Sequence, residues 1–448
     1  MKKYDVFVIG SGMSGMTVAN KCASKGLKVG ITDELPYDGT CALRGCDPKK
    51  VIIGATEVRD FAQRLKGNGI DTVPEVNWED IMAFKQSFVD AMPPKIEKGY
   101  KNKDIDTYHT SAKFVSNNTL QVGDEVIEAN KFVIATGAKP RVLDFEGGNL
   151  ALSSTEFLNL KKLPESLLFI GGGYIAFEFA HIAARAGADV TILHRGDHPL
   201  ENFDHDIVQH LVNATQNLGI KLVLETEVSK IEKKEDHFVV TGKSNGKEVT
   251  YRTDSVFNSA GRPPAIFDLD LEKAGISFSK KGITVNEYLQ STSNSNIYAA
   301  GDSADSKGLP LTPVAVMEGH VVASNLIKGN KKKVNYPPMP SVVFTLPTLA
   351  SVGLTEAEAK SQQIEYQVNY NNAESWFNAK RLNVQEYAYK TIIDKENQTI
   401  LGAHLIGPNA EETINLFAMA IKTKIKINEL RTMIFTYPTL SSDIPHML

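Results

Sequence analysis

Two segments of this 448-residue chain have the same order of parts: a short apolar strand, a glycine-rich turn, a helix and a second strand. They are "YDVFVIGSGMSGMTVANKCASKGLKVGITD" (4–33) and "LLFIGGGYIAFEFAHIAARAGADVTILHR" (167–195). The turns follow the G-x-G-x-x-G/A spacing, with Gly10, Gly12 and Gly15 in the first and Gly171, Gly173 and Ala176 in the second. Such glycines let the backbone turn tightly and approach a pyrophosphate at a helix N-terminus. The sequence therefore predicts two Rossmann-like dinucleotide-binding domains.

The two segments differ at the end of the second strand, where ribose selectivity is set. In the first, Asp33 stands where a carboxylate accepts hydrogen bonds from ribose hydroxyls. In the second, His194 and Arg195 occupy the equivalent place, and a cation there suits a 2′-phosphate. We therefore expect a tightly held flavin and an exchangeable nicotinamide, with NADPH favoured over NADH.

The stretch "DGTCALRGCDPKK" (38–50) contains two of the three cysteines of the chain, Cys41 and Cys46. A helix is expected to begin near Pro48, and its N-terminus and the two lysines that follow would favour a thiolate. A disulfide here can accept two electrons from a reduced flavin. Two buried thiols or half of a zinc site are the alternatives, but zinc needs more ligands. The sequence favours a redox pair, assigns Cys22 to packing, and predicts no metal site.

The segments around the two units indicate the domain order. Strand-like stretches at 131–140 and 255–264 are expected to join two domains, and 295–304 ends an apolar strand in Gly301 and Asp302. Beyond residue 337 strands alternate with amphipathic helices. We predict an α/β protein with two Rossmann-like domains and a C-terminal α+β dimerisation domain. The expected boundaries are 1–144 and 264–336 for the flavin domain, 145–263 for the nicotinamide domain and 337–448 for the dimerisation domain.

Charge and hydropathy restrict the partners. The formal charge is −4 and the isoelectric point is near 6.2, which does not favour nucleic acid. No stretch approaches the roughly 20 apolar residues of a membrane span. Three cysteines do not form a disulfide framework, so we expect a cytoplasmic protein. We also expect its substrate to be a small molecule.

With these motifs assembled, the chain resembles the flavin-dependent pyridine nucleotide–disulfide oxidoreductases, which include glutathione reductase, dihydrolipoamide dehydrogenase and mercuric reductase. The resemblance extends over essentially the whole chain. Besides the fingerprints and the cysteine stretch, it rests on "ATG" (135–137), "GRPP" (261–264), "AAGD" (299–302) and "VGLTEAEA" (352–359). It implies FAD as the flavin and a homodimer. Each active site would combine the redox pair of one subunit with the C-terminal tail of the other.

The resemblance also assigns roles to individual residues. Cys46 would form the thiolate charge-transfer contact with FAD, and Cys41 would attack the substrate. Lys50 would lie near flavin N5 with Glu178 as its partner, and Tyr437 would stand at the acid/base position. The cofactor-binding residues expected from the motifs are Gly10, Gly12, Ser14, Gly15, Asp33, Gly39, Thr40, Lys50, Thr136, Gly137, Gly171, Gly173, Tyr174, Ile175, Glu178, His194, Arg195, Gly261, Gly301 and Asp302.

Three departures from the family pattern bear on the substrate. Leu43 replaces the asparagine of the usual C-x-N-x-G-C stretch. The tail reads "FTYPTLSSDIPHML", so Tyr437 replaces the usual histidine and Ser442 its supporting glutamate. His446 is an alternative acid/base, and Asp443 an alternative partner of Tyr437. Asn20 replaces a glutathione-contacting arginine, which disfavours glutathione.

These features leave three hypotheses. The first is an NADPH-dependent FAD disulfide reductase that acts on a small disulfide. The second is a related flavoenzyme that reduces a metal ion, as mercuric reductase does, or a quinone or dioxygen. The third is a non-catalytic flavin redox sensor.

Overall fold

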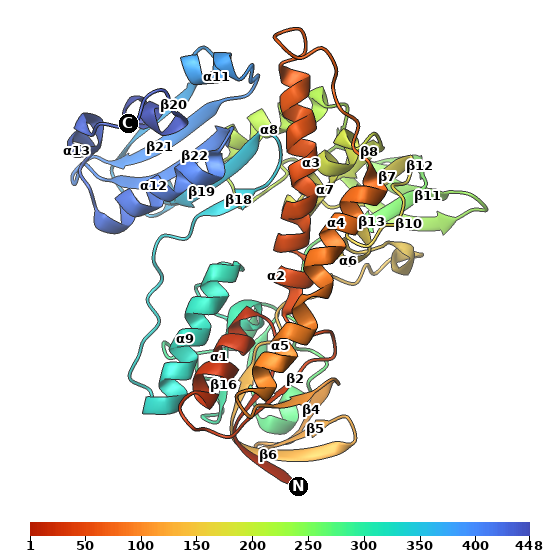
Figure 1. Ribbon diagram of the computed structural model, residues 1–448, viewed down its shortest axis with the longest axis vertical. Coiled ribbons are helices and arrows are strands. Elements are labelled where there is room, and N and C mark those ends of the chain that lie inside the picture. Colours follow the sequence, from red (N-terminus) through yellow and green to blue (C-terminus); the bar gives the residue numbers. More distant parts are fainter. The chain divides into compact units, whose positions relative to one another are not determined.

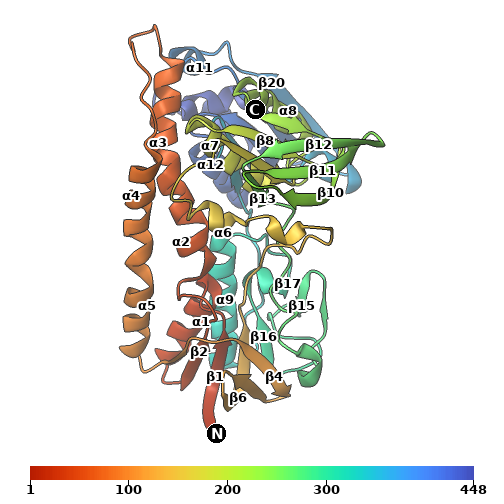
Figure 2. The ribbon, with the colours of Figure 1, turned by 90° about the vertical axis from the view of Figure 1, so that its right-hand side faces the viewer.

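The computed structural model describes all 448 residues, and the chain divides into two compact units. Unit 1 comprises Met1–Val51, Ala83–Arg141 and Arg262–Tyr336. Unit 2 comprises Ile52–Met82, Val142–Gly261 and Pro337–Leu448. Two of the five boundaries fall within helices, in α3 (Cys46–Arg64) and α4 (Trp78–Asp90). Figures 1 and 2 show the elements of both units.

Unit 1 is built on a sheet with the order β3-β2-β1-β6-β5-β4, and β16 pairs in parallel with the last residues of β6, beyond those that pair with β5. Its central strands are parallel, with Val6 opposite Val29 and Phe7 opposite Phe132. The strands are β1 (Lys2–Ile9), β2 (Val29–Thr32), β3 (Asp106–Tyr108), β4 (Ala112–Ser116), β5 (Thr119–Val122), β6 (Glu125–Ile134) and β16 (Ile297–Ala299). Every residue of β2 is buried, as expected for a central parallel strand.

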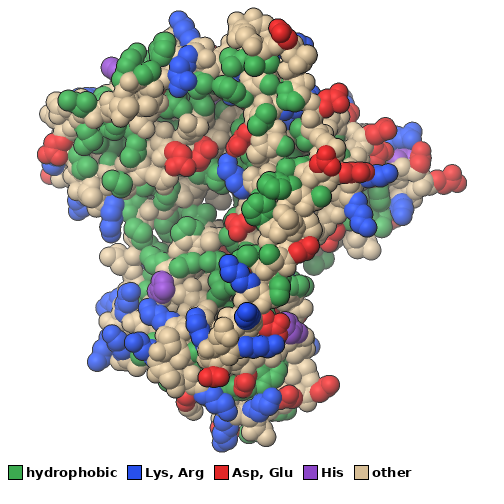
Figure 3. All heavy atoms as spheres, viewed as in Figure 1, with side chains coloured by type: hydrophobic (Ala, Val, Ile, Leu, Met, Phe, Trp, Pro, Cys, Tyr) green, Lys and Arg blue, Asp and Glu red, His purple; other side chains and the backbone are tan.

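Helices α1 (Met13–Ala23) and α9 (Thr312–Lys328) lie side by side in both ribbon views. Their apolar residues share one core with the sheet, which includes Val18 and Val322. The remaining elements of unit 1 are α2 (Gly39–Arg44), α5 (Met92–Lys101), β14 (Phe278–Ser279), β15 (Gly282–Thr284), β17 (Ala304–Asp305), η2 (Leu271–Ala274) and η3 (Gly301–Ser303). Figure 3 shows basic side chains gathered over the region of α1, α5 and α9, with acidic ones among them.

The first part of unit 2 has a four-stranded parallel sheet in the order β13-β7-β8-β9. Its strands are β7 (Ser166–Ile170), β8 (Asp189–Leu193), β9 (Lys221–Val223) and β13 (Ser255–Asn258), and its helices are η1 (Gly148–Leu150), α6 (Ser154–Phe157), α7 (Tyr174–Arg185) and α8 (His205–Asn217). A separate antiparallel sheet contains β10 (Thr226–Lys233), β11 (Phe238–Ser244) and β12 (Lys247–Thr253). Phe157, Phe169 and Phe177 are fully buried in the core.

The C-terminal part of unit 2 is an antiparallel sheet in the order β18-β19-β22-β21-β20. Its strands are β18 (Ser341–Val343), β19 (Thr348–Gly353), β20 (Tyr366–Asn372), β21 (Ala388–Asp394) and β22 (Ile400–Gly407). The helices are α10 (Glu356–Ser361), α11 (Phe377–Arg381), α12 (Ala410–Thr423), α13 (Ile427–Thr432) and η4 (Leu440–Met447). These elements confirm the predicted α/β class with a C-terminal α+β domain. No helix is long and apolar enough to cross a membrane.

Candidate active site

The first glycine-rich turn joins β1 to α1 in unit 1. A Cβ atom on Gly10, where φ is +101°, would lie 2.3 Å from the carbonyl oxygen of Ala135. A Cβ atom on Gly15 would lie 2.0 Å from the carbonyl oxygen of Gly10. Gly12, in contrast, has no atom within 4 Å of such a position. The turn is thus packed tightly on its inner side and open at Gly12, where α1 begins and a phosphate group can approach.

Asp33 holds this turn in place. Its Oδ2 accepts hydrogen bonds of 2.7 Å from both the backbone N–H and the hydroxyl of Ser11. Its Oδ1 accepts a hydrogen bond from the N–H of Leu35. The carboxylate therefore links the end of β2 to the glycine-rich turn, at the predicted ribose position.

The end of β16 lies against the start of α1. Ser14 is buried, and its hydroxyl donates to the carbonyl oxygen of Ala300. The next residue, Gly301, donates its N–H to buried Glu318, which belongs to α9. Burial raises the pKa of the Asp302 carboxyl, and Arg262 opposes this effect. Ser14, Gly301 and Asp302, predicted from separate motifs, thus come together in unit 1.

Residues 135–137 follow β6 and lie beside the glycine-rich turn. The Cα of Thr136 would be 3.0 Å from a Cβ atom on Gly10. The Thr136 hydroxyl is buried and has no protein hydrogen-bond partner, and Gly137 has no atom within 4 Å of a Cβ position. An unsatisfied buried hydroxyl beside an open turn of backbone amides fits a polar, phosphate-bearing cofactor. The described residues of unit 1 therefore fit FAD.

The redox segment packs directly on that turn. A Cβ atom on Gly39 would lie 2.5 Å from the Cα of Gly12. Cys41 lies on the short helix α2, whereas Cys46 is the first residue of α3. The helix thus begins two residues before the expected Pro48, and its N-terminal amides start at the cysteine itself. Lys50 lies exposed in the first turns of α3.

Both cysteines are free thiols, and the hydroxyl of a single residue lies close to both sulfur atoms. Thr312, the first residue of α9, donates to Cys41 Sγ at 3.1 Å and lies 3.7 Å from Cys46 Sγ. The hydrogen bond from the Cys41 thiol lowers the pKa of Cys46 to about 6, and Thr312 and Lys49 contribute in the same direction. The same interaction and burial raise the pKa of Cys41. Of the two reduced thiols, Cys46 therefore loses its proton more easily than Cys41.

The second glycine-rich turn lies in unit 2 between β7 and α7. A Cβ atom on Gly171, where φ is +109°, would lie 2.5 Å from the carbonyl oxygen of Ser259. The imidazole of His194 lies under the turn, since its Nδ1 accepts from the N–H of Gly172 at 3.1 Å. Its Nε2 is 2.9 Å from the carbonyl oxygen of His198. Both ring nitrogens are thus used within the fold, and the exposed cation of the predicted pair is Arg195.

Three other predicted residues lie on α7. Tyr174 is 48% exposed, and Ile175 beside it is half-buried. Glu178 is 2% exposed, and its Oε1 accepts a hydrogen bond from the N–H of Phe344, which follows β18. Gly261, with φ at +112°, ends the segment that follows β13.

The C-terminal tail exposes Tyr437. Its side chain is 73% exposed, and its ring lies 6.4 Å from that of Phe377. Asp443 does not pair with it, because this carboxylate is buried and accepts hydrogen bonds from Tyr387 and Asn378. The alternative of an Asp443–Tyr437 pair is therefore wrong.

The other two tail candidates have different surroundings. Thr439 caps η4, and the hydroxyl of Ser442 in the first turn accepts from the N–H of Thr439 and donates to its carbonyl oxygen. His446 is exposed, and its ring lies 5.9 Å from that of Trp376.

Two residues of the site have no counterpart in the sequence prediction. Thr312 precedes Pro313, and a Thr-Pro pair predicts a helix start but not a contact with distant sulfurs. Asp38 is the first residue of the cysteine stretch 38–50. Its φ is +105°, and its Oδ2 is buried without a protein partner. Burial raises the pKa of this carboxyl. Its left-handed conformation could have been suspected only from its place beside Gly39.

Comparisons with known proteins agree with this geometry. The family model of the pyridine nucleotide-disulphide oxidoreductases matches residues 4–319, and the model of their dimerisation domain matches residues 339–448. The chain belongs to this family. Its members are FAD-dependent enzymes that use a pyridine nucleotide, so the prediction of an FAD-dependent oxidoreductase is confirmed.

Several relatives align over nearly the whole chain. A glutathione reductase of Burkholderia cepacia is 32% identical, over 99% of this chain and 98% of the relative. A mercuric reductase of Staphylococcus aureus is 31% identical, over 98% and 81%. A dihydrolipoyl dehydrogenase of the same species is 32% identical, over 97% and 94%. The structure of the HOCl-induced flavoprotein disulfide reductase RclA of Escherichia coli in complex with Cu(II) matches with a TM-score of 0.88 and 28% identity, over 100% and 99% of the two chains.

Proposed function

We propose that this flavoenzyme is an NADPH-dependent disulfide reductase that acts on a small disulfide through Cys41 and Cys46. The observation that carries the proposal is the thiol pair at Thr312, in which Cys46 has a lowered pKa and Cys41 a raised one. We also propose a cytoplasmic homodimer, because the chain has three cysteines and a dimerisation domain.

The residues of unit 1 would hold FAD at the open glycine-rich turn, with Asp33 at the ribose and Asp302 near the ribityl chain. Bound FAD would take a hydride from NADPH and supply two electrons to the Cys41–Cys46 disulfide. The reduced thiols then act on the substrate. The Cys41 thiol gives up its proton as its sulfur attacks one sulfur of the substrate disulfide. The substrate S–S bond breaks, a Cys41–substrate disulfide forms, and the first substrate sulfur leaves as a thiol with a proton. The Cys46 thiolate then attacks the Cys41 sulfur, which restores the Cys41–Cys46 disulfide, and the second substrate sulfur takes up a proton and leaves as a thiol.

Proton delivery to the leaving thiol would fall to Tyr437, which is exposed on the C-terminal tail. In the proposed homodimer this tail would complete the active site of the other subunit. A phenol can donate a proton to a leaving sulfur, whereas a carboxylate or an amide at this position would not do so near neutrality. Lys50 and Glu178 keep the flavin-side roles proposed for them.

The thiol assignment can be tested by anaerobic titration with NADPH. The two-electron-reduced enzyme is expected to show a long-wavelength charge-transfer band. Cys41→Ser should retain the band, because the Cys46 thiolate remains, whereas Cys46→Ser should lose it. Survival of the band in both variants would show that the roles are wrong.

Preference for NADPH rests on Arg195, the exposed cation at the end of β8. Arg195 lines a hollow on the surface of unit 2, together with Asp197 and Glu225. Arg195→Ala is expected to raise KM for NADPH about tenfold or more, from loss of a charge-assisted bond, and to leave KM for NADH nearly unchanged. An equal change for both nucleotides would contradict the assignment.

A second candidate function is reduction of a metal ion, a quinone or dioxygen. It is supported by the tyrosine at the histidine position, because these acceptors need no proton delivered to a leaving thiol. The similarity to mercuric reductases and to the RclA complex with Cu(II) supports it as well. An acceptor screen with both nicotinamides separates the two candidates, and turnover of any acceptor excludes a non-catalytic sensor.

A further inference from the structure

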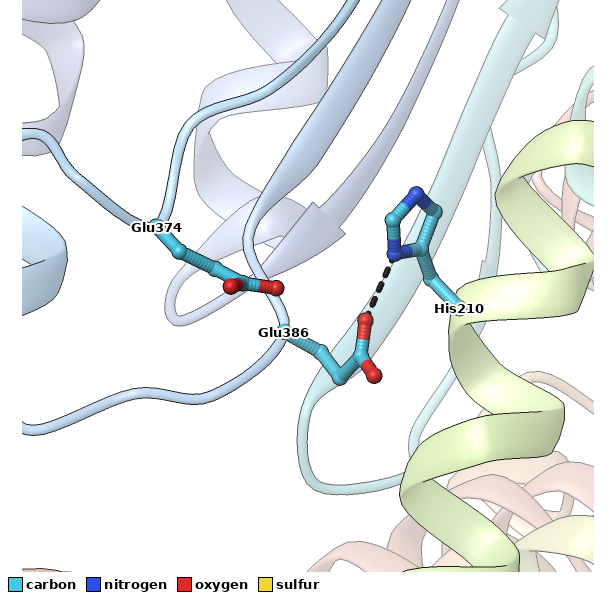
Figure 4. A group of neighbouring side chains, drawn as sticks. All are labelled: His210, Glu374 and Glu386. Atoms are coloured by element: carbon cyan, nitrogen blue, oxygen red, sulfur yellow. Dashed lines mark hydrogen bonds and ion pairs between the residues drawn. The ribbon is translucent and has the colours of Figure 1, made fainter.

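We propose that His210, Glu374 and Glu386 in unit 2 form a binding site for one divalent transition-metal ion, with Zn²⁺ the best match. Each residue offers one ligand atom, and these atoms all lie within 4.8 Å of one another. Figure 4 shows the three side chains converging from α8 and from the loop between β20 and β21. The sequence prediction of no metal site did not consider them, because 164 residues separate His210 from Glu374.

The register of the sheet brings the two glutamates together. Strands β20 and β21 are antiparallel, with Asn372 opposite Ala388. The pairing continues beyond the strands, since the N–H of Ala373 donates to the carbonyl oxygen of Tyr387. Glu374 and Glu386 come next and lie at the two ends of the same loop. Their proximity is therefore fixed by the backbone and does not depend on a long flexible segment.

His210 faces these carboxylates from α8. Its Nδ1 lies 2.6 Å from Glu386 Oε2, and its Nε2 lies 3.1 Å from the hydroxyl of Tyr370 on β20. The side chains of His210 and Glu386 are only 12% and 10% exposed. A ligating imidazole is usually oriented by a partner on its other nitrogen, and Tyr370 is placed to do this.

Glu374 is oriented in a similar way. The side-chain amide of Asn372 donates to Glu374 Oε1 at 2.9 Å, while the N–H of Glu374 donates to the side-chain oxygen of Asn372. This reciprocal pair holds the carboxylate near the loop end. Two of the three ligands thus have an outer partner that fixes their direction, as ligands of a metal ion do.

The surrounding charge favours a cation. Asp206 lies one helical turn before His210 on α8, and it pairs with buried Lys390 of β21 at 2.7 Å. Lys390 also pairs with Asp204 at 3.2 Å and Glu356 at 2.6 Å. One ammonium group therefore faces three carboxylates. The negative charge left over adds to that of the two glutamates and attracts a divalent ion.

The donor set indicates the kind of ion. Imidazole nitrogen with carboxylate oxygen suits Zn²⁺ and its first-row neighbours, whereas Mg²⁺ and Ca²⁺ prefer oxygen alone. Two ligands of one zinc ion lie at most about 4.2 Å apart, twice the usual bond of about 2.1 Å. The ligand atoms lie within 4.8 Å of one another, so the longest separation must shorten by at most about 0.6 Å to meet this limit. Three protein ligands leave a fourth position for water.

The ion would join α8 to the loop that carries α11. In this loop Asn378 donates to the carbonyl oxygen of Thr439 and to Asp443 in the C-terminal tail. Binding at the three ligands would therefore restrain the segment on which the tail around Tyr437 rests.

Isothermal titration of ZnCl₂ into the untagged, EDTA-treated holoenzyme tests the site. The enzyme is kept oxidised, so that Cys41 and Cys46 are a disulfide and do not bind zinc. One ion per chain is expected. Glu374→Gln and His210→Asn should each weaken binding at least tenfold, because each replaces a strong ligand atom by the weakly coordinating oxygen of a neutral amide. Glu365→Gln, an exposed carboxylate on the same unit, should leave the affinity unchanged.

Flavin absorbance and circular dichroism of each variant show whether it is folded. Folded variants that bind one ion as tightly as the original chain would overturn the proposal. So would the absence of saturable binding to the original chain. In that case the contact between His210 and Glu386 is an ordinary ion pair that holds α8 to the sheet.

Discussion

Replacement of Thr312 by alanine isolates the contribution of one hydroxyl to the reactive thiol pair. This hydroxyl lies 3.1 Å from Cys41 Sγ and 3.7 Å from Cys46 Sγ, and it helps to lower the pKa of Cys46 to about 6. Thr312→Ala removes the one hydroxyl that lies close to both sulfurs. The change leaves the backbone at the start of α9 unaltered.

A hydrogen bond to a charged group contributes about 1.5–3 kcal/mol, and 1.36 kcal/mol corresponds to one pH unit. Thr312→Ala is therefore expected to move the midpoint of the Cys46 titration upward by about 1 to 2 pH units. The Cys41 thiol and Lys49 still lower the pKa of Cys46 in the variant. We therefore expect a shift near the lower end of this range.

The measurement is the charge-transfer absorbance of the anaerobically reduced enzyme between pH 5 and pH 9. Thr312→Ser keeps the hydroxyl and should titrate like the original chain, which makes it the matched control. An unchanged or lower midpoint in Thr312→Ala, with the serine variant normal, would refute the role assigned to this hydroxyl.

Three further predictions follow from the packing. Gly15→Ala should abolish FAD retention, measured as the flavin-to-protein absorbance ratio, because its Cβ would lie 2.0 Å from a carbonyl oxygen; Gly99→Ala, in open space, should retain FAD. Asp38→Gly should raise the stability by about 1–3 kcal/mol at pH 7.5, since it relieves a left-handed backbone. The raised pKa of Asp38 means that its ionisation costs stability as pH rises, so urea unfolding should show a smaller gain at pH 4; an equal gain at both pH values would contradict this. Tyr387→Phe removes a donor to buried Asp443 and should cost about 1–2 kcal/mol, whereas Tyr366→Phe, at a weaker contact, should be neutral; equal losses would argue against the buried bond.

The sequence predicted those parts of the molecule that depend on local patterns. The strand, turn and helix of both glycine-rich segments follow from periodicity and glycine spacing, and the cysteine stretch was recognisable from its resemblance to the family. Helix α3 begins at Cys46, two residues before Pro48, because proline is tolerated in the first helical turn and so does not fix the first residue.

Tertiary contacts escaped the prediction. His194 looked like a cofactor contact, but the close approach of Gly172 uses its Nδ1 within the fold. Asp443 is engaged by Asn378 and Tyr387, from segments more than 50 residues away. Thr312 reaches the sulfurs across 266 residues of sequence. No spacing rule links such positions, because only the packing of α9 and of the C-terminal sheet brings them together.

The contact between Gly39 and Gly12 has a consequence for protein engineering. Since the two backbones leave no room for a methyl group between them, the cofactor loop and the thiol loop cannot be exchanged independently. A chimera that takes its redox segment from a relative would have to take the matching glycine-rich turn as well. Transplanting only one of the two should produce a protein whose lost activity is not recovered by excess flavin.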